Sequence, residues 1–150
     1  MALIIQKFGG SSVADAEKIR NVARIITDTY QKGNRVVAVL SAQGDTTDDL
    51  IEKAAEINPA ASKRELDMLL STGEQISCAL CAMAIEDMGF PVVSLTGWQA
   101  GFRTNSGYGN ARIKRVQGER IRAELDKRRI VIVTGFQGLN KYDDITTLGR

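Results

Sequence analysis

Four short apolar segments alternate with segments of helical periodicity, and this alternation restricts the chain to few folds. The apolar segments are residues 3–8 (LIIQKF), 35–42 (RVVAVLSA), 91–97 (PVVSLTG) and 130–138 (IVIVTGFQG). Continuously apolar runs are typical of parallel strands that are covered on both faces. Parallel strands need long crossover connections, which are usually helices. We therefore expect an α/β fold with a mainly parallel sheet and helices on both of its faces.

The segments between the strands predict the helices. One helix carries its apolar face on Ile19, Val22, Ala23, Ile26 and Tyr30 and stops at Gly33, and others are expected at 44–58, 63–88 and 118–129. We expect the long helical region to be interrupted at STGEQ (71–75). The glycine-rich segment 101–113 is predicted to be a loop with a short extended piece at its end.

Length and composition describe one ordinary globular domain. The 150 residues are 43% hydrophobic and 25% charged, with a net charge of +2 that favours no particular partner. The basic cluster Lys127, Arg128 and Arg129 is interpreted as a helix end and not as a nucleic-acid site. The chain stops in the middle of a motif, TTLGR, so we expect a fragment of a longer domain.

Two further expectations concern location and cysteine chemistry. No uninterrupted apolar run approaches the roughly 18 residues of a membrane helix, and the N-terminus has no signal-peptide layout. We therefore expect a cytoplasmic protein without a membrane partner. Cys78 and Cys81 lie in a helical pattern rich in alanine and leucine, so we interpret them as small core residues and not as a redox or metal pair.

The chain contains no histidine. This excludes mechanisms that use a histidine base or nucleophile, and most zinc and haem sites. Any chemistry must use lysine, arginine, carboxylates, hydroxyls and backbone amides.

Glycine and hydroxyl residues follow all four predicted strands, at the sheet edge where parallel α/β folds bind ligands. The first of these loops runs K-F-G-G-S-S. Gly9 and Gly10 let a ligand approach the backbone, the next helix offers its N-terminal amides, and Lys7 adds positive charge. This combination suits phosphate, although it is not a Walker A loop, in which lysine follows the glycines. A tight strand–helix turn with a surface lysine fits the loop equally well when it is taken alone.

Six motifs in order, KFGGSSV, SAQGDTTDDL, STGEQIS, GNARI, VTGFQG and TTLGR, span the chain and resemble those of aspartate kinases. The resemblance implies an amino-acid kinase fold, a three-layer αβα sandwich with a mainly parallel sheet. Residues 1–150 would form the N-terminal part of its catalytic domain, incomplete at the C-terminus and without the regulatory ACT domains. The implied reaction is ATP-dependent phosphorylation of the side-chain carboxylate of L-aspartate to 4-phospho-L-aspartate. This reaction opens lysine, threonine and methionine biosynthesis, and the full-length enzyme is expected to be an oligomer.

That reaction suits a chain without histidine, because the acceptor carboxylate is already ionised at neutral pH and needs no general base. Phosphoryl transfer requires positioning and neutralisation of phosphate charge, with Mg²⁺ carried on the nucleotide and no metal site of the protein's own. Lys7 is the expected catalytic residue. Lys7, Phe8, Gly9 and Gly10 are the expected ATP-binding residues.

The aspartate pocket is assigned by the resemblance. Glu74 would receive the substrate ammonium group, and Arg150 would hold the α-carboxylate as a bidentate fork. Ser41 and Thr47 would donate hydrogen bonds to carboxylate oxygens, although a strand end and a helix cap are their simpler roles. The family pattern also assigns Leu125 and Asp126 to the substrate side, without a physical derivation.

Two residues depart from the family pattern. Gln43 stands where methionine is usual, and Tyr108 stands where histidine is common, which removes a group that titrates near neutral pH. Two alternatives stay open. The chain resembles, less well, other amino-acid kinases such as acetylglutamate, glutamate or UMP kinases. It could also be an inactive binding or assembly module, and we expect these 150 residues alone to lack kinase activity.

Overall fold

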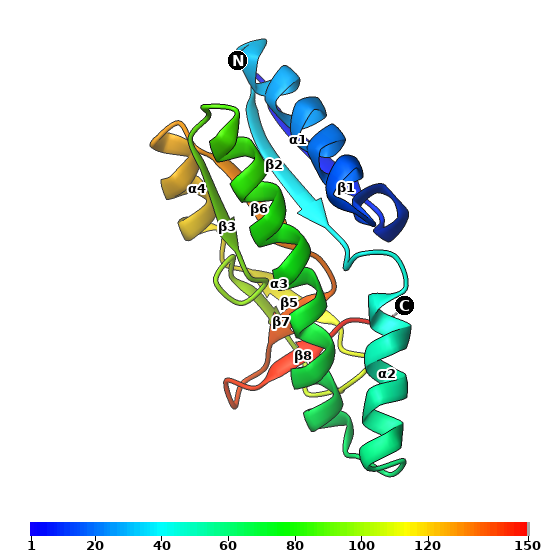
Figure 1. The fold of residues 1–150 in the computed structure, drawn as a ribbon. Coiled ribbons are helices and arrows are strands. Elements are labelled where there is room, and N and C mark those ends of the chain that lie inside the picture. Colours follow the sequence, from blue (N-terminus) through cyan, green and yellow to red (C-terminus); the bar gives the residue numbers. More distant parts are fainter. Residues whose placement is uncertain (150) are drawn as a thin grey trace.

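The computed structural model describes residues 1–149, which form two sheets joined by a long helix (Figure 1). Sheet A contains four parallel strands in the order β1-β2-β6-β3. Their bounds are β1 (Leu3–Phe8), β2 (Arg35–Leu40), β3 (Val92–Leu95) and β6 (Ile130–Thr134). Each of the four predicted strands therefore contributes a strand to one parallel sheet, although only the first part of the segment 130–138 belongs to it.

Helices cover both faces of sheet A. On one face, α1 (Ala16–Gln31) and α3 (Lys63–Asp87) pack against alternate residues of β2 and β6, among them Val36 and Ile132. On the other face, α4 (Glu119–Asp126) packs against the intervening residues, among them Val37 and Val131. The three-layer αβα arrangement is confirmed, because continuously apolar strands offer both faces to helices.

The core confirms the predicted role of the cysteines and of the α1 face. Cys78 and Cys81 are both buried and are free thiols within the cluster between α1 and α3. Burial raises the pKa of the Cys81 thiol to about 12, and burial also raises the pKa of Cys78. Neither cysteine is therefore an activated thiolate at neutral pH.

The predicted interruption at STGEQ is wrong, because α3 is continuous over its 25 residues. Gly73 is buried within it, and a Cβ there would lie 2.9 Å from the Cβ of Ala42. The glycine therefore allows close helix packing and does not break the helix. By length and composition α3 could span a membrane, but half of its apolar window is buried, as in ordinary core helices, so this is weak evidence of a span.

The structure contains a second sheet that the sequence analysis did not predict. Sheet B has the order β5-β4-β7-β8, and only β4 and β7 are parallel. Its strands are β4 (Phe102–Thr104), β5 (Ile113–Val116), β7 (Gln137–Leu139) and β8 (Ile145–Thr147). The predicted loop 101–113 thus contains a strand at its start. The predicted strand 130–138 is two strands, separated by Gly135 and Phe136.

A buried hydrogen-bond network joins the two sheets to α3. Thr134 Oγ1 accepts from the backbone N–H of Gly97 at 2.7 Å and donates to Oε1 of Gln137 at 2.7 Å. Nε2 of Gln137 donates to the carbonyl of Ser71 on α3 at 2.5 Å. Gly97 cannot carry a side chain, because its Cβ would lie 2.4 Å from the carbonyl oxygen of Gln137. This junction fixes how sheet B is placed against sheet A.

The basic cluster lies at a helix end, as predicted. Helix α4 ends at Asp126, and Lys127 and Arg129 pair with the buried carboxylate of Glu124. Burial by itself would raise the pKa of Glu124, but the surrounding cations outweigh it and lower the pKa below the ordinary value of 4.5.

Candidate functional site

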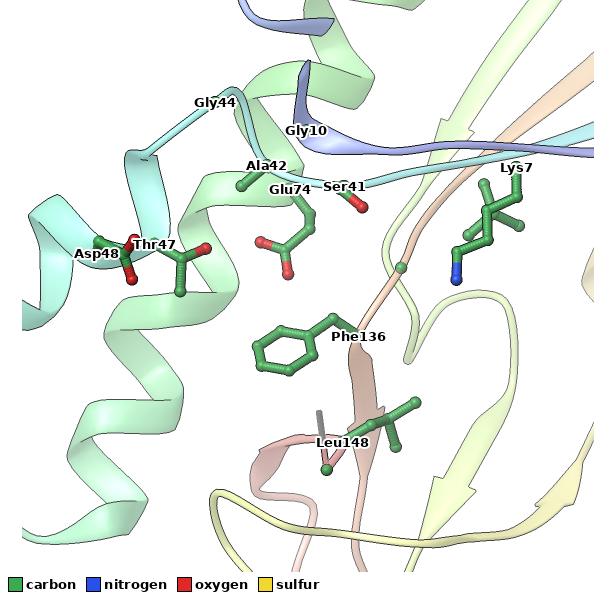
Figure 2. A pocket seen from close by; sticks show the side chains of 13 residues that line it. Lys7, Gly10, Ser41, Ala42, Gly44, Thr47, Asp48, Glu74, Phe136 and Leu148 are labelled. Atoms are coloured by element: carbon green, nitrogen blue, oxygen red, sulfur yellow. The ribbon is translucent and has the colours of Figure 1, made fainter. Parts of the chain in front are cut away.

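A cavity of about 590 Å³ opens at the carboxyl ends of β1, β2 and β6 (Figure 2). The glycine loop after β1, the start of α2 (Thr46–Ile57), the middle of α3 and the end of β8 surround it. Its lining residues come from every one of these segments: Lys7, Gly10, Val39, Ser41, Ala42, Gly44, Thr47, Asp48, Glu74, Gly135, Phe136, Leu148 and Gly149.

The first loop places Lys7 and Gly10 in the cavity wall, and Figure 2 shows the Lys7 side chain extending into the open space. A Cβ at Gly10 would lie 2.9 Å from the Ala42 carbonyl oxygen, so this glycine permits close contact with the loop after β2. A Cβ at Gly9 would meet nothing within 4 Å, so Gly9 faces open space. The Phe8 side chain packs against the core instead, and only its carbonyl reaches the loops, where it accepts from the Ser41 N–H.

The predicted helix N-terminus at this loop differs from expectation. A single 3₁₀ turn, Gly10–Val13, follows the glycines, and α1 begins only at Ala16. Asp15 caps α1 by accepting from the N–H of Lys18. The amides near the cavity therefore belong to the loop and the 3₁₀ turn and not to α1.

The second wall is built by the end of β2 and the start of α2, which carry Ser41 and Thr47. The Ser77 hydroxyl donates to the Ser41 carbonyl at 2.7 Å and so ties this strand end to α3. Gln43, the residue that departs from the family pattern, donates from Nε2 to the Val13 carbonyl at 3.0 Å. Its amide thus joins the first two loops.

Glu74 is the buried carboxylate of the site, with 2% of its surface exposed. It projects from the middle of α3 toward the cavity, on the side opposite the Lys7 side chain (Figure 2). The exposed carboxylate of Asp48 lies at the rim of the same cavity. The site therefore offers a cation at the end of β1 and carboxylates on the two helices.

The third wall is built by Phe136, Leu148 and Gly149, none of which was predicted as a site residue from the sequence. Phe136 follows β6 with φ +74°, a conformation rare for a bulky side chain, and its carbonyl accepts from the Leu148 N–H at 2.9 Å. Leu148 and Gly149 continue this wall. The motifs VTGFQG and TTLGR contained these residues, but their composition did not indicate which of them would face a ligand.

The structure brings some predicted site residues together and not others. Leu125 is buried under the far face of sheet A, and Asp126 is exposed and lies 3.7 Å from Arg35 at the beginning of β2. Both are thus at the amino ends of the strands, away from the cavity. Arg150 lies outside the described residues.

The cavity chemistry suits a ligand that carries both positive and negative groups. Lys7 and the loop amides can hold an anion, and Glu74 can hold a cation. Within residues 1–149 no group of three acidic or cysteine side chains could hold a metal ion.

Comparisons with known proteins identify the family of this chain. The model of the amino acid kinase family matches residues 2–150. The chain is 55% identical over its full length to the aspartokinase of Geobacillus stearothermophilus, but it spans only 37% of that protein. Among solved structures it resembles the aspartate kinase of Synechocystis, with a TM-score of 0.82 at 41% identity, covering 99% of this chain and 24% of that one.

A more distant structure shares the fold. It is Escherichia coli aspartokinase III in complex with aspartate and ADP, with a TM-score of 0.85 at 22% identity, covering all of this chain and 44% of that one. Sequence motifs, family model and fold lead to the same assignment. The chain belongs to the amino acid kinase family.

Proposed function

We propose that this chain is the N-terminal part of the catalytic domain of an aspartate kinase, which phosphorylates the side-chain carboxylate of L-aspartate with ATP. The observation that carries the proposal is that Lys7 and Glu74, from the first and the third motif of the series, line one cavity. The positive charge of Lys7 can bind a phosphate, and the negative charge of Glu74 can bind the ammonium group of an amino acid. The names of the relatives support aspartate as the acceptor.

In this proposal Lys7 is the catalytic residue. Its ammonium group, together with the amides of Gly9 and Gly10, stabilises the charge on the transferring phosphoryl group. The acceptor carboxylate attacks as an anion, so no side chain has to remove a proton. Mg²⁺ enters with the nucleotide, and when bound it neutralises phosphate charge.

The aspartate end of the cavity is proposed to lie between α3, the end of β2 and the end of β8. Glu74 holds the ammonium group, and Ser41 and Thr47 donate to carboxylate oxygens. Arg150, which follows Gly149 in sequence, is assigned to the α-carboxylate. The product 4-phospho-L-aspartate, its use in lysine, threonine and methionine biosynthesis, a cytoplasmic location and an oligomeric enzyme belong to the same proposal.

The experiment is a coupled assay of ADP release by the full-length protein that carries this chain. L-Aspartate, L-glutamate, N-acetyl-L-glutamate and UMP are offered in parallel, because they represent the acceptors of the rival kinases. Of these four acceptors, we expect only L-aspartate to support turnover. Turnover with one of the other acceptors, and none with aspartate, would replace aspartate kinase by that rival.

Glu74→Gln tests the substrate side of the cavity. The change keeps the shape and removes the charge, so we expect the KM for aspartate to rise by about tenfold or more while the KM for ATP stays within about twofold. Glu86→Gln is the matched control, since Glu86 is an exposed carboxylate near the end of the same helix. A weakened ATP interaction with unchanged aspartate binding would move Glu74 to the nucleotide side.

The isolated 150 residues test the alternative of a binding or assembly module. We expect no aspartate-dependent ADP release from them, because no adenine pocket was recognised in this sequence. Calorimetric titration with Mg-ATP measures what the phosphate loop alone contributes. Micromolar binding together with turnover would show that the chain holds a complete kinase site.

A further inference from the structure

Asp67 is a second buried carboxylate on α3, outside the cavity lining and without a role in the function proposed above. Only 1% of its surface is exposed. It lies seven residues before Glu74, so two helical turns, about 10.5 Å along the axis, separate the two on the same side of α3. Both carboxylates are therefore carried by one rigid element.

The carboxylate of Asp67 accepts three hydrogen bonds from two other segments. Oδ2 accepts from the backbone N–H of Gly109 at 2.9 Å and from the backbone N–H of Thr147 at 3.0 Å. Oδ1 accepts from the Thr147 hydroxyl at 2.7 Å. One side chain of α3 thus fixes both the 105–111 loop and the end of β8.

Residues 147–149, which we term the cavity arm, lead directly from this contact into the site. Leu148 and Gly149 line the cavity, and the next residue in sequence is Arg150. The arm is also bonded sideways, because the Ala111 N–H donates to the Thr147 carbonyl at 3.0 Å and the Gly149 N–H donates to the Ala111 carbonyl at 3.3 Å. The loop that Asp67 holds through Gly109 is thus the same loop that supports the arm.

A buried carboxylate is a costly way to fill space, because burial of a charge is unfavourable unless hydrogen bonds compensate it. Its advantage is direction, since charge-assisted hydrogen bonds are shorter and stronger than neutral ones. Here two of them join Thr147, which begins the cavity arm, and the third joins Gly109 in the loop that supports the arm. A well-packed leucine at this position would fill the volume but would leave these donors without an acceptor.

We propose that Asp67 is a positioning residue for the aspartate pocket, which sets the cavity arm at a fixed height along α3 relative to Glu74. The inference rests on the proposed function, because Glu74 and the residue after the arm are the two groups assigned to the substrate's ammonium and α-carboxylate. Asp67 itself does not line the cavity. Its effect is to hold the spacing between Glu74 and the cavity wall formed by Leu148 and Gly149.

The test compares Asp67→Ala with Asp67→Asn in the full-length protein. Alanine removes all three hydrogen bonds, so we expect the KM for aspartate to rise by about tenfold, with the KM for Mg-ATP within about twofold of the original value. Asparagine keeps an acceptor oxygen for the two backbone N–H groups, and its amide can donate to the Thr147 hydroxyl, so we expect it to restore most of the lost affinity.

Two further variants separate positioning from general loss of stability. Ile85→Val removes one methylene from the buried core at the other end of α3, and we expect both KM values to stay unchanged. Thr147→Val keeps the side-chain shape and removes only the 2.7 Å hydrogen bond, so it tests the tether even where Asp67→Ala fails to fold. We expect a rise of about threefold in the KM for aspartate.

Amide hydrogen exchange gives a readout that does not depend on activity. We expect exchange at Gly109 and Thr147 to be at least about tenfold faster in Asp67→Ala than in Ile85→Val. Unchanged exchange at both amides would show that Asp67 does not hold Gly109 and Thr147 in place, and would overturn the proposal. Equal changes in the KM values for aspartate and Mg-ATP would overturn the assignment to the aspartate pocket. A wild-type protein without aspartate-dependent activity would instead refute the proposed function, and the tether would then be judged by exchange alone.

Discussion

Sheet A and sheet B differ in what holds them together. The central strands of sheet A, β2 and β6, are built from aliphatic residues, and helices bury them on both faces. The buried residues of sheet B are mostly polar, among them Thr104, Gln137, Thr146 and Thr147. Sheet A is stabilised mainly by apolar burial, whereas sheet B depends on directed hydrogen bonds.

The difference follows from what each sheet does. Sheet A supplies the strand ends that carry Lys7 and Ser41, and apolar packing of the sheet between helices is the main contribution to their placement. Sheet B carries the cavity arm, whose place depends on contacts between segments far apart in sequence, such as Asp67 with Thr147. Apolar packing tolerates small shifts, but a hydrogen bond requires a defined geometry. The cavity thus has one wall that is held mainly by apolar packing, at the strand ends of sheet A, and one wall that is held by hydrogen bonds of defined geometry, at the cavity arm.

The largest effect on stability should come from the core of sheet A. Ile132 is fully buried between β2, α1 and α3, so Ile132→Ala should lower the free energy of unfolding by about 3–4 kcal/mol through lost burial and a cavity. Urea denaturation followed by circular dichroism measures the change. A loss below about 1 kcal/mol would mean that apolar packing does not dominate sheet A.

The junction between the sheets should give the next largest effect. Gln137→Leu removes three hydrogen bonds, which join this side chain to Thr134 Oγ1, the Gly97 N–H and the Ser71 carbonyl. We therefore expect the free energy of unfolding to fall by about 2–3 kcal/mol. Trp98, the only tryptophan, lies in the connection from β3 to β4 and reports on this region by fluorescence. Gln99→Leu, at an exposed turn nearby, is the control and should cost far less.

A smaller effect is expected inside sheet B. The hydroxyls of Thr104 and Thr146 lie 2.6 Å apart and are both buried. Thr104→Val keeps the shape and should cost about 1 kcal/mol, because one buried hydroxyl loses its partner. A double-mutant cycle with Thr146→Val measures the coupling between the two hydroxyls. Additive losses would show that this pair does not hold the sheet.

The smallest effect concerns pH and the turn between β7 and β8. The Arg64 guanidinium, followed by the Tyr108 hydroxyl, lowers the pKa of Asp144 below its ordinary value of 3.8. The hydrogen bond to Asp144 is the main cause that raises the pKa of Tyr108 above 10. Because the pKa of Asp144 is lowered on folding, its ionised form stabilises the fold above pH 3.8, and this stabilisation is lost as the pH falls further. Because the pKa of Tyr108 is raised on folding, its neutral form stabilises the fold below pH 10, and this stabilisation is lost as the pH rises above that value.

We therefore expect this contribution to be constant between about pH 5 and pH 9. Tyr108→Phe should flatten the alkaline loss of stability, and Tyr142→Phe, which removes an exposed hydroxyl, is the control. Thermal denaturation from about pH 5 to about pH 11 measures both variants through the region where the tyrosine contribution is lost. A change in thermal stability near neutral pH that Tyr108→Phe abolishes would contradict the upward direction assigned to the pKa of Tyr108.

The sequence allowed sheet A to be predicted in detail and sheet B hardly at all. Strands such as Val92–Leu95 are apolar runs whose pattern is local, so four strands and most helix positions could be inferred. The strands β4, β7 and β8 have three residues each and contain glycine or threonine in place of an apolar run. Strands β7 and β8 pair across a short turn, but β4 joins them through a partner far along the chain. No local pattern indicates such pairing.

The same distinction applies to the site. Lys7, Gly10, Ser41, Thr47 and Glu74 were predicted from motifs, and all of them line the cavity. Phe136 was not predicted as a lining residue. Its position in the cavity wall depends on a positive φ, and a phenylalanine gives no indication of that conformation in the sequence. Asp67 was not predicted either, because an aspartate inside a helical pattern looks the same whether it faces solvent or a buried backbone.

The continuity of α3 also has a consequence for the order of folding. Its C-terminal half packs in the core of sheet A, and its N-terminal half contacts β8 and carries Asp67, which binds the cavity arm. We expect sheet A and α3 to form the folding nucleus and sheet B to join it late, so Ile85→Val should slow refolding and Thr104→Val should mainly speed unfolding. Stopped-flow chevron analysis of the two variants measures this, and equal effects on both refolding rates would argue for simultaneous formation of the two sheets.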